Sequence, residues 1–219
     1  MSKTYAIADL HGRHDLLLAA LAEVLAHEPG TLVTLGDYID RGPDSRPIIA
    51  RLMSLQTRPP TLWKVVCLKG NHEQMMTESM KRPLNRGQWI SNGGETTLAS
   101  YNNDVPQDHL QWIAGLPSIH VDEHRVFVHA GVDPTCPLEE QKDECLLWYR
   151  YADGADIGHG ERHVVHGHTP RPYGPECLQH RTNLDTYAWR TGRLVIGVFD
   201  DGLPGGPSDL IEIKGSPAP

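Results

Sequence analysis

Five short apolar segments of this chain each end in Asp, Asn, Arg or His side chains. One of them, residues 31–35 (TLVTL), is followed by residues 36–42 (GDYIDRG), which place two carboxylates and a guanidinium within five positions. Side chains that follow buried parallel strands meet at one edge of a sheet, where α/β proteins bind their ligands. One such cluster alone is also typical of an exposed turn. Five of them in one chain indicate a common site.

The five clusters offer a mixed set of carboxylate, amide and imidazole groups. They are Asp9/His11, Asp37/Asp40/Arg41, Asn71/His72, His129 and His166/His168. Nitrogen and oxygen ligands together suit Mn, Fe or Zn, whereas a Ca or Mg site would be built from oxygen alone. The four cysteines show no C-x-x-C spacing, so we do not expect a structural zinc site.

The apolar pattern predicts an α/β fold. Residues 5–8 and 31–35 are expected to be strands, and the leucines of residues 14–27 recur at helical spacing between them. A β-α-β opening calls for a parallel strand pair with a right-handed crossover. The same reasoning predicts further helices at 45–56 and 138–149, and further strands at 64–68, 125–128 and 163–165. We expect strands 182–186 and 194–199 to form part of a second, antiparallel sheet.

Residues 73–117 have a different character, with helical spacing and several methionines and tryptophans. We interpret them as a helical insertion that covers one end of the sheet, and their large apolar side chains as packing residues. Residues 1–213 are predicted to form a single domain. The Gly- and Pro-rich residues 214–219 are expected to be a flexible tail.

Charge and hydropathy narrow the choice of partners. The formal charge of −8 gives no basic surface that would follow a nucleic acid, so nucleic-acid partners are not expected. No apolar run is long enough to span a bilayer, and the first residues lead directly into a strand, so we expect no membrane partner. We therefore expect a cytoplasmic protein with reduced thiols. The sequence leaves the oligomeric state open.

Five sequence blocks carry a resemblance to a known family. They are DLHG (9–12), GDYIDRG (36–42), GNHE (70–73), HAG (129–131) and GH (167–168). In this order they resemble the signature blocks of the calcineurin-like metallophosphoesterases. More narrowly, they resemble the phosphoprotein phosphatase (PPP) family in its bacterial and phage-type branch. The resemblance implies an α/β (α+β) fold in which two packed mixed β-sheets are flanked by helices, with the helical insertion over the active-site end.

The resemblance also implies a dinuclear metal centre. The implied ligands are Asp9, His11 and Asp37 for one ion, and Asp37, Asn71, His129 and His168 for the other. Two divalent ions bridged by Asp37 would ionise a shared water molecule near neutral pH, and that hydroxide would be the nucleophile. Manganese is the first choice of metal, with Fe, Zn, Ni and Co as alternatives. His166 is expected to support the site without binding metal.

Four further residues receive catalytic roles from the resemblance. Arg41 is similar to the family's phosphate-binding arginine, because a guanidinium can hold two phosphoryl oxygens. His72 resembles the general acid that protonates the leaving group, and Asp40 would hold its other nitrogen and raise its pKa. Arg150, which follows an L-W segment, resembles a second phosphate-binding arginine of bacterial and phage members.

The resemblance leaves two substrate classes open. One is a phosphorylated protein, cleaved by a protein-serine/threonine phosphatase that can extend to phosphotyrosine, or a small phosphoester. The other is a dinucleoside polyphosphate, cleaved by a bis(5'-nucleosyl)-tetraphosphatase, and this chain is short for such an enzyme. We favour phosphomonoester hydrolysis on proteins. A catalytically silent phosphate-binding module is a further alternative, but such a module usually loses a ligand or the acid, and this sequence retains all of them.

Overall fold

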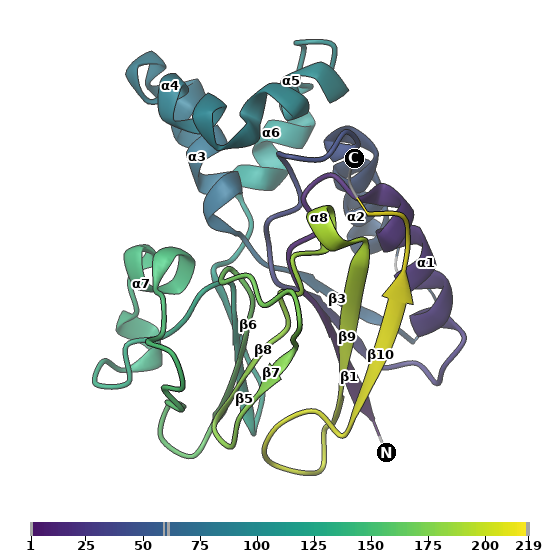
Figure 1. Ribbon diagram of the computed structural model, residues 1–219, viewed down its shortest axis with the longest axis vertical. Coiled ribbons are helices and arrows are strands. Elements are labelled where there is room, and N and C mark those ends of the chain that lie inside the picture. Colours follow the sequence, from purple (N-terminus) through teal and green to yellow (C-terminus); the bar gives the residue numbers. More distant parts are fainter. Residues whose placement is uncertain (1, 59, 61, 218–219) are drawn as a thin grey trace.

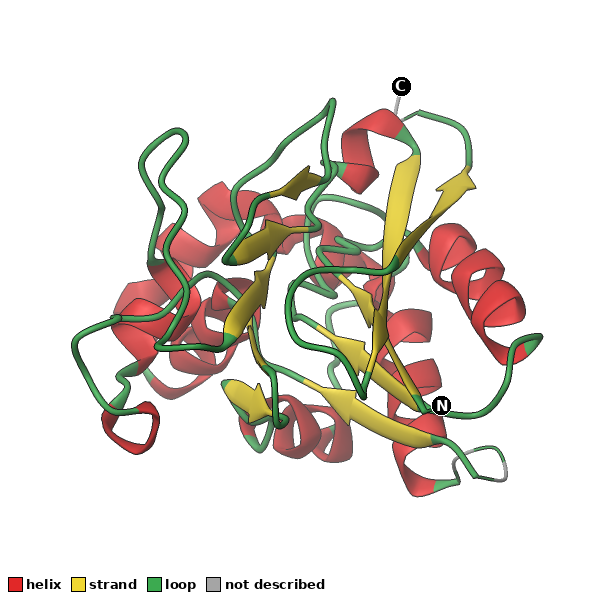
Figure 2. Cartoon of the chain, turned by 90° about the horizontal axis from the view of Figure 1, so that it is seen from below, coloured by secondary structure: helices red, strands yellow, loops and turns green. Residues whose placement is uncertain are grey.

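Two five-stranded β-sheets pack face to face in the computed structural model, which describes residues 2–58, 60 and 62–217 (Figure 1). Helices lie outside the two layers of strands (Figure 2). A further group of helices stands above the upper ends of the strands in Figure 1. The sequence prediction of two mixed sheets flanked by helices is confirmed.

The first sheet has the strand order β10-β9-β1-β2-β3. Its strands are β1 (Lys3–Ile7), β2 (Thr31–Thr34), β3 (Lys64–Cys67), β9 (Arg193–Asp200) and β10 (Asp209–Lys214). Strands β1, β2 and β3 run parallel, and helices α1 (His14–Leu25) and α2 (Ser45–Thr57) connect them. The β-α-β opening expected from the sequence is therefore present, and it brings the ends of all three strands to one edge.

The second sheet has the strand order β4-β5-β6-β8-β7. Its strands are β4 (Ile119–Val121), β5 (Arg125–Val128), β6 (His163–His166), β7 (Glu176–Cys177) and β8 (Arg181–Asn183). Strands β5, β6 and β8 are parallel, whereas β4 and β7 pair antiparallel at the two edges. The carboxyl ends of the neighbouring strands β5 and β6 therefore lie side by side at the same end of this sheet.

The expectation of a second, antiparallel sheet built from residues 182–186 and 194–199 is wrong. Strand β8 joins the second sheet but runs parallel to β6. Strand β9 belongs to the first sheet, where it lies antiparallel between β1 and β10. Its continuous apolar run suits a central strand that is buried on both faces, a feature that apolarity alone cannot assign to one sheet or the other. Strand β10 was not predicted.

The insertion forms a group of short helices above the sheets (Figure 1). Its elements are α3 (Asn71–Lys81), the 3₁₀ turn η1 (Pro83–Asn85), α4 (Arg86–Trp89), the π-helical turn η2 (Ile90–Gly94), α5 (Glu95–Ser100) and α6 (Gln107–Ala114). The insertion was expected from residue 73, but α3 begins at Asn71. Asn71 and His72 therefore lie in the first turn of a helix.

Two short helical segments replace the single helix expected over residues 138–149. The 3₁₀ turn η3 (Leu138–Glu140) is followed by α7 (Asp143–Trp148). Gln141 and Lys142 between them have extended backbone conformations, which interrupt the helix. Helix α8 (Ala188–Thr191) is a single turn between β8 and β9.

The alternation of side chains along β1 explains how one strand supports two layers. Tyr5 and Ile7 belong to the core shared with α1 and α2, whereas Ala6 belongs to the core between the sheets, together with Phe127 of β5 and Phe199 of β9. Both sets are almost fully buried. The strand ends at the upper edge are thus fixed from both sides.

The chain end differs from the expected tail at its first positions. Lys214 is the last residue of β10, the Gly215 N–H donates to the Gly192 carbonyl (2.7 Å), and Arg13 donates to the Ser216 carbonyl (2.8 Å). Residues 218 and 219 lie outside the described part of the chain. Among the described residues, no helix is sufficiently long and apolar to cross a membrane.

Acid should destabilise the protein through His163. Burial lowers the pKa of this histidine to about 4, and its Nε2 lies 2.8 Å from the Thr182 hydroxyl. The folded pKa lies below the unfolded value of about 6.5, so on acidification the unfolded chain binds a proton before the folded protein does. The free energy of unfolding therefore falls between pH 6.5 and 4. We expect a loss on the order of 2 kcal/mol, measured by urea unfolding in EDTA.

The control for this pH effect is His163→Gln, which cannot titrate in that range. Its free energy of unfolding should fall less steeply than that of the unmodified protein between pH 6.5 and 4. Equal slopes for the two proteins would show that His163 does not supply this contribution.

Candidate metal centre

Five strand ends deliver the candidate ligands to one buried cluster. Asp9 and His11 follow β1, Asp37 follows β2, Asn71 follows β3, and His129 and His168 follow β5 and β6. All six of these side chains are buried, with at most 8% of each residue exposed. The parallel arrangement of β1–β3 and of β5–β6 explains why the ends coincide. The six residues were predicted as metal ligands, and the structure brings them to one edge.

The backbone at the cluster adopts conformations that are rare for residues other than glycine. Six residues of the site have φ between 33° and 70°: Asp9, His11, Asp37, Asp40, Arg41 and His168. Such values are unfavourable for residues with a Cβ and are characteristic of functional sites held by their surroundings. Gly36, with φ of 91°, must be glycine, because a Cβ there would lie 2.4 Å from the Gly70 nitrogen.

One half of the cluster brings nitrogen and oxygen atoms of four side chains close together. His129 Nε2 lies 2.9 Å from Asn71 Oδ1, 3.2 Å from His168 Nδ1 and 3.5 Å from Asp37 Oδ1. His168 Nδ1 is also 3.1 Å from Asn71 Oδ1. Four ligand atoms, all on residues that were predicted to bind one ion, therefore face one another.

The tautomer of His129 shows that this half fits a cation. Its Nδ1 lies 2.9 Å from the Leu35 carbonyl oxygen, which can only accept, so the proton is on Nδ1 and Nε2 carries a lone pair. Burial lowers the pKa of His129, which keeps the ring neutral. The lone pair of Nε2 and the Asn71 oxygen then face each other over 2.9 Å, and neither can donate to the other. A divalent cation between them resolves this conflict, and the N/O set suits Mn, Fe or Zn.

The other half of the cluster contains His11, Asp37 and His72. His11 Nδ1 lies 2.8 Å from the Ile39 carbonyl oxygen, so the proton is on Nδ1, and the lone pair of Nε2 lies 3.3 Å from Asp37 Oδ2. The ligand atoms of His11, Asp37 and His72 lie within 4.8 Å of one another, as do those of Asp37, His129 and His168. Asp37 therefore belongs to both halves, as expected for a bridging ligand.

Asp9 has a different arrangement from the other candidate ligands. Its two carboxylate oxygens accept the backbone N–H of His168 at 3.1 and 3.2 Å, and it lies in neither group of three ligand atoms. Burial, followed by the charges of Asp185 and Asp37, raises its pKa well above the usual range. This repulsion between buried carboxyl groups is the electrostatic situation that a bound cation relieves.

Asp40 holds His72 from the side opposite to the cluster. His72 Nδ1 donates to Asp40 Oδ2 over 2.7 Å, so Nε2 faces the cluster, 3.9 Å from Asp37 Oδ2. Burial alone would lower the pKa of His72, but the charges of Asp37 and Asp40 outweigh it and raise the pKa. The Thr97 hydroxyl (2.6 Å) and the Trp89 indole N–H (3.0 Å) donate to Asp40 in turn.

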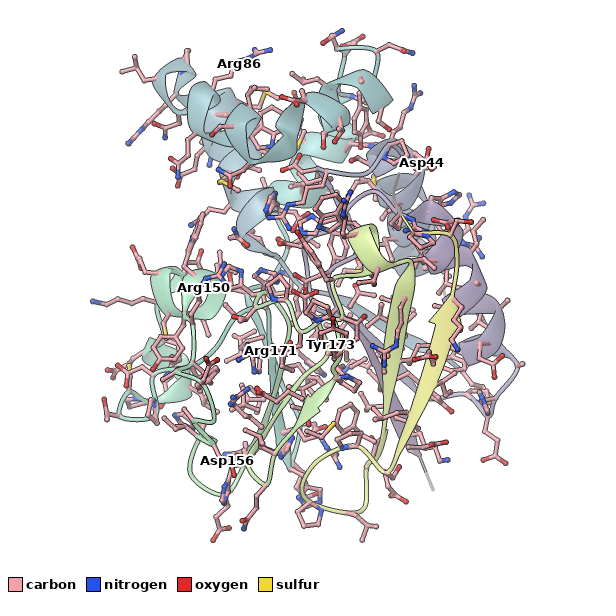
Figure 3. All side chains as sticks on the ribbon, viewed as in Figure 1. Asp44, Arg86, Arg150, Asp156, Arg171 and Tyr173 are labelled. Atoms are coloured by element: carbon pink, nitrogen blue, oxygen red, sulfur yellow. The ribbon has the colours of Figure 1, made fainter. Side chains whose placement is uncertain are left out.

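The two predicted phosphate-binding arginines stand near the cluster. Arg41 donates to His11 Nε2 at 2.7 Å and lies 3.1 Å from His72 Nε2. A cation on His11 would replace the first bond and leave the guanidinium for a phosphate. Arg150 lies two residues beyond the end of α7 and is exposed (Figure 3). Burial and the charge of His129 lower the pKa of His168, and the charge of Arg150 makes a smaller contribution in the same direction.

Two other residues of the blocks have supporting positions. The Glu73 carboxylate accepts the backbone N–H groups of Asp37 (2.9 Å), Tyr38 (2.9 Å) and Gly70 (2.8 Å), which fixes the loop that carries Asp37. His166 Nε2 lies 3.2 Å from the Arg181 guanidinium, away from the ligand atoms listed above. Neither residue joins the groups of ligand atoms.

Sequence reasoning missed three residues of this site. Trp89 was expected only to pack, and Thr97 received no role, although both hold Asp40. Asp185 is buried after β8, and burial, together with the charge of Asp37, raises its pKa to about 7. A signal existed for Asp185, because it follows a strand as the other clusters do. The contacts of Trp89 and Thr97 had no such signal.

A comparison with known protein families decides the identity of this fold and site. The calcineurin-like phosphoesterase model matches residues 2–192. The chain belongs to the calcineurin-like phosphoesterases. As a member of this family it is a hydrolase that acts on phosphoester bonds, and two divalent metal ions are typical of the family. The identification agrees with the resemblance found in the sequence blocks.

Several phosphoesterases resemble this chain. The symmetrical bis(5'-nucleosyl)-tetraphosphatase of Salmonella arizonae is 27% identical over 207 residues, which cover 87% of this chain and 67% of the relative. A solved structure of a candidate diadenosine tetraphosphatase has a TM-score of 0.68 at 24% identity and covers 98% of this chain and 94% of its own. A protein serine/threonine phosphatase from Saccharomyces cerevisiae has a TM-score of 0.64 at 15% identity and covers 100% and 81%.

Proposed function

We propose that this phosphoesterase hydrolyses phosphomonoesters, with phosphoserine and phosphothreonine in proteins as the leading substrate class and phosphotyrosine as an extension. Arg41 binds the phosphoryl oxygens through its guanidinium, and Arg150 adds a second positive charge from the end of α7. His72 donates a proton from Nε2 to the departing oxygen. Asp40 keeps the other nitrogen protonated and the ring oriented.

The proposed ligands of the two metal ions are Asp9, His11 and Asp37 for one, and Asp37, Asn71, His129 and His168 for the other. Two such ions supply an ionised water molecule at neutral pH and neutralise charge on the phosphate. We propose manganese as the first choice of metal. Asn71 is a neutral ligand, so it holds an ion without adding negative charge that would repel the substrate.

The observation that carries this proposal is the hydrogen bond between His72 and Asp40. Burial opposes the charged form of His72, but the charge of Asp37, with the hydrogen bond and charge of Asp40, outweighs it and raises the pKa of His72, which favours the protonated ring that a general acid needs. Alkoxide leaving groups such as those of serine and threonine require that proton, whereas the leaving groups of phosphoanhydrides depart as stable anions. The presence of a general acid held by Asp40 therefore favours a phosphate ester of an alcohol as the substrate.

A second candidate is hydrolysis of dinucleoside tetraphosphates. The curated relatives that match this chain, including the enzyme from Salmonella arizonae, carry that activity in their names. Their similarity supports a substrate with a polyphosphate chain between two nucleosides. The same metal ligands and Arg41 would serve this reaction, while the demand on His72 would be smaller.

Activity should depend on a divalent metal. We expect protein stripped with EDTA and dialysed to lose activity on p-nitrophenyl phosphate by at least about 10³-fold, because the ions supply several kcal/mol of charge stabilisation. Addition of Mn²⁺ should restore it. Undiminished activity after stripping, verified by metal analysis, would refute the metal-dependent mechanism.

The substrate class is tested by a direct comparison at equal enzyme concentration with Mn²⁺. The three substrates are a phosphoserine peptide, the same peptide with phosphotyrosine, and diadenosine tetraphosphate. The proposal expects the highest kcat/KM on a phosphopeptide. A kcat/KM at least tenfold higher on the dinucleotide would overturn the leading proposal in favour of the second candidate.

A further inference from the structure

Trp189 stands beside the arginine to which we assign phosphate binding. The guanidinium carbon of Arg41 lies over its indole ring, 5.9 Å from the ring centroid. Trp189 is half-buried, so part of the ring remains accessible. An indole next to a cation presents a flat surface that can stack with a second aromatic ring. No role in the reaction as described above requires this side chain.

The position of Trp189 is fixed by its surroundings. The buried Arg13 guanidinium donates to the backbone carbonyls of Ala188 (3.2 Å) and Trp189 (3.4 Å). The ring of Tyr187 meets the indole edge to face, with centroids 5.3 Å apart and planes at 81°. Tyr187 itself has a φ of 61°, which is unfavourable for a tyrosine. The single turn of α8 therefore holds the indole in one place.

Two cavities adjoin Trp189, and Arg41 lines both of them. One has a volume of about 430 Å³ and is also lined by Ile90 and Asn92 of η2. The other has a volume of about 590 Å³ and extends to Pro43 and Thr96. Volumes between roughly 300 and 1,000 Å³ are typical of sites that bind small molecules. A ring bound against Trp189 would therefore lie next to the phosphate at Arg41.

The approach of η2 to Arg41 depends on one glycine. Gly93 has a φ of 104°, and a Cβ at this position would lie 2.9 Å from the Arg41 nitrogen. Its carbonyl accepts the Arg41 backbone N–H at 3.3 Å. The insertion thereby lines the smaller cavity together with Arg41 and Trp189.

The indole N–H of Trp189 is not part of the surface that a ligand could reach. It is buried and has no hydrogen-bond partner among the described residues. A bound molecule would therefore contact the exposed part of the ring rather than its N–H.

We propose that Trp189 determines specificity by stacking with an aromatic group that the substrate carries next to its phosphate. This inference rests on the proposed phosphoesterase function and names the chemistry of the group attached to the phosphate. A phosphotyrosine ring and a nucleobase share this chemistry. Phosphoserine and phosphothreonine lack an aromatic ring, so KM for substrates that carry them should not depend on Trp189.

The test compares Trp189→Leu and Trp189→Phe with the unmodified Mn²⁺-loaded protein on the three substrates named above. We expect Trp189→Leu to raise KM about tenfold on an aromatic substrate, to change kcat less than about threefold, and to leave the phosphoserine peptide unchanged. Trp189→Phe should retain most of the affinity. A loss on the phosphotyrosine peptide identifies the tyrosine ring as the stacked group, and a loss on diadenosine tetraphosphate identifies the base.

A matched control is Trp112→Leu. The Trp112 indole N–H donates a hydrogen bond to Gln56 (2.7 Å), and Trp112 lines neither cavity. It should leave KM unchanged on all three substrates. Equal losses on every substrate for Trp189→Leu, or none on either aromatic substrate, would overturn the proposal.

Binding measured without turnover separates this inference from the proposed function. Phenylphosphonate and the methylenephosphonate analogue of AMP, whose P–C bonds are not hydrolysed, should each be titrated by calorimetry against the unmodified protein and Trp189→Leu, with inorganic phosphate as reference. At least one of the aromatic ligands should bind about tenfold more weakly to the variant, while phosphate binding stays equal. Equal affinities of the two proteins for both aromatic ligands would refute the stacking role, whatever the activity assays show.

Discussion

Replacing His72 by Asn should lower kcat on a phosphoserine peptide by about 10² to 10⁴-fold. The amide can keep a hydrogen bond to Asp40, which lies 2.7 Å from Nδ1 of the native ring, but it cannot transfer a proton. On p-nitrophenyl phosphate the loss should be at most about tenfold, because nitrophenolate leaves without protonation. The ratio of the two losses measures the contribution of the acid.

The control for His72 is Asp40→Asn, which leaves the imidazole in place. Because Asp40 raises the pKa of His72, this variant should show a smaller loss than His72→Asn, again concentrated on the phosphoserine peptide. Its activity should also decline at a lower pH than that of the unmodified protein. If His72→Asn reduced turnover of both substrates equally, the role of His72 as acid would be wrong.

Replacing Asp37 by Asn should abolish activity on every substrate, with a loss of at least about 10³-fold. Asp37 is the residue shared by the two groups of ligand atoms, with Oδ2 3.3 Å from His11 and Oδ1 3.5 Å from His129. A neutral amide in this position cannot bridge two cations. Metal analysis after dialysis against Mn²⁺ should show that the variant retains fewer ions than the unmodified protein.

Asp185→Asn serves as the comparison for Asp37. Asp185 is also buried beside the cluster but is not assigned as a ligand, and its Oδ1 accepts the Tyr187 N–H at 2.8 Å, a bond that an amide oxygen can keep. This variant should retain its metal content. Loss of both ions in Asp185→Asn but not in Asp37→Asn would contradict the assigned bridge.

The strand ends of the site could be predicted from the sequence because each depends on local patterns. An apolar run predicts a strand, and the polar residues directly after it must lie at the strand's end. The parallel order of β1, β2 and β3 follows from the helices between them. The positions of Asp9, Asp37 and Asn71 at one edge follow from that order, and their roles as ligands remain predictions.

The supports of the general acid could not be predicted in this way. Trp89 and Thr97 are 49 and 57 positions from Asp40, and they reach it only because the insertion folds back over the sheet. Hydrophobic spacing indicates that such a segment is helical. It does not indicate which side chain of the segment will contact Asp40. The sheet membership of β9 was missed for a related reason, because an apolar run does not identify its neighbours.

The most direct test of the dinuclear centre is anomalous diffraction from crystals grown with Mn²⁺. Two anomalous peaks should appear, one beside Asp9, His11 and Asp37, and one beside Asp37, Asn71, His129 and His168. Asp37 should contact both. A single peak, or peaks at residues other than these six, would contradict the proposed centre.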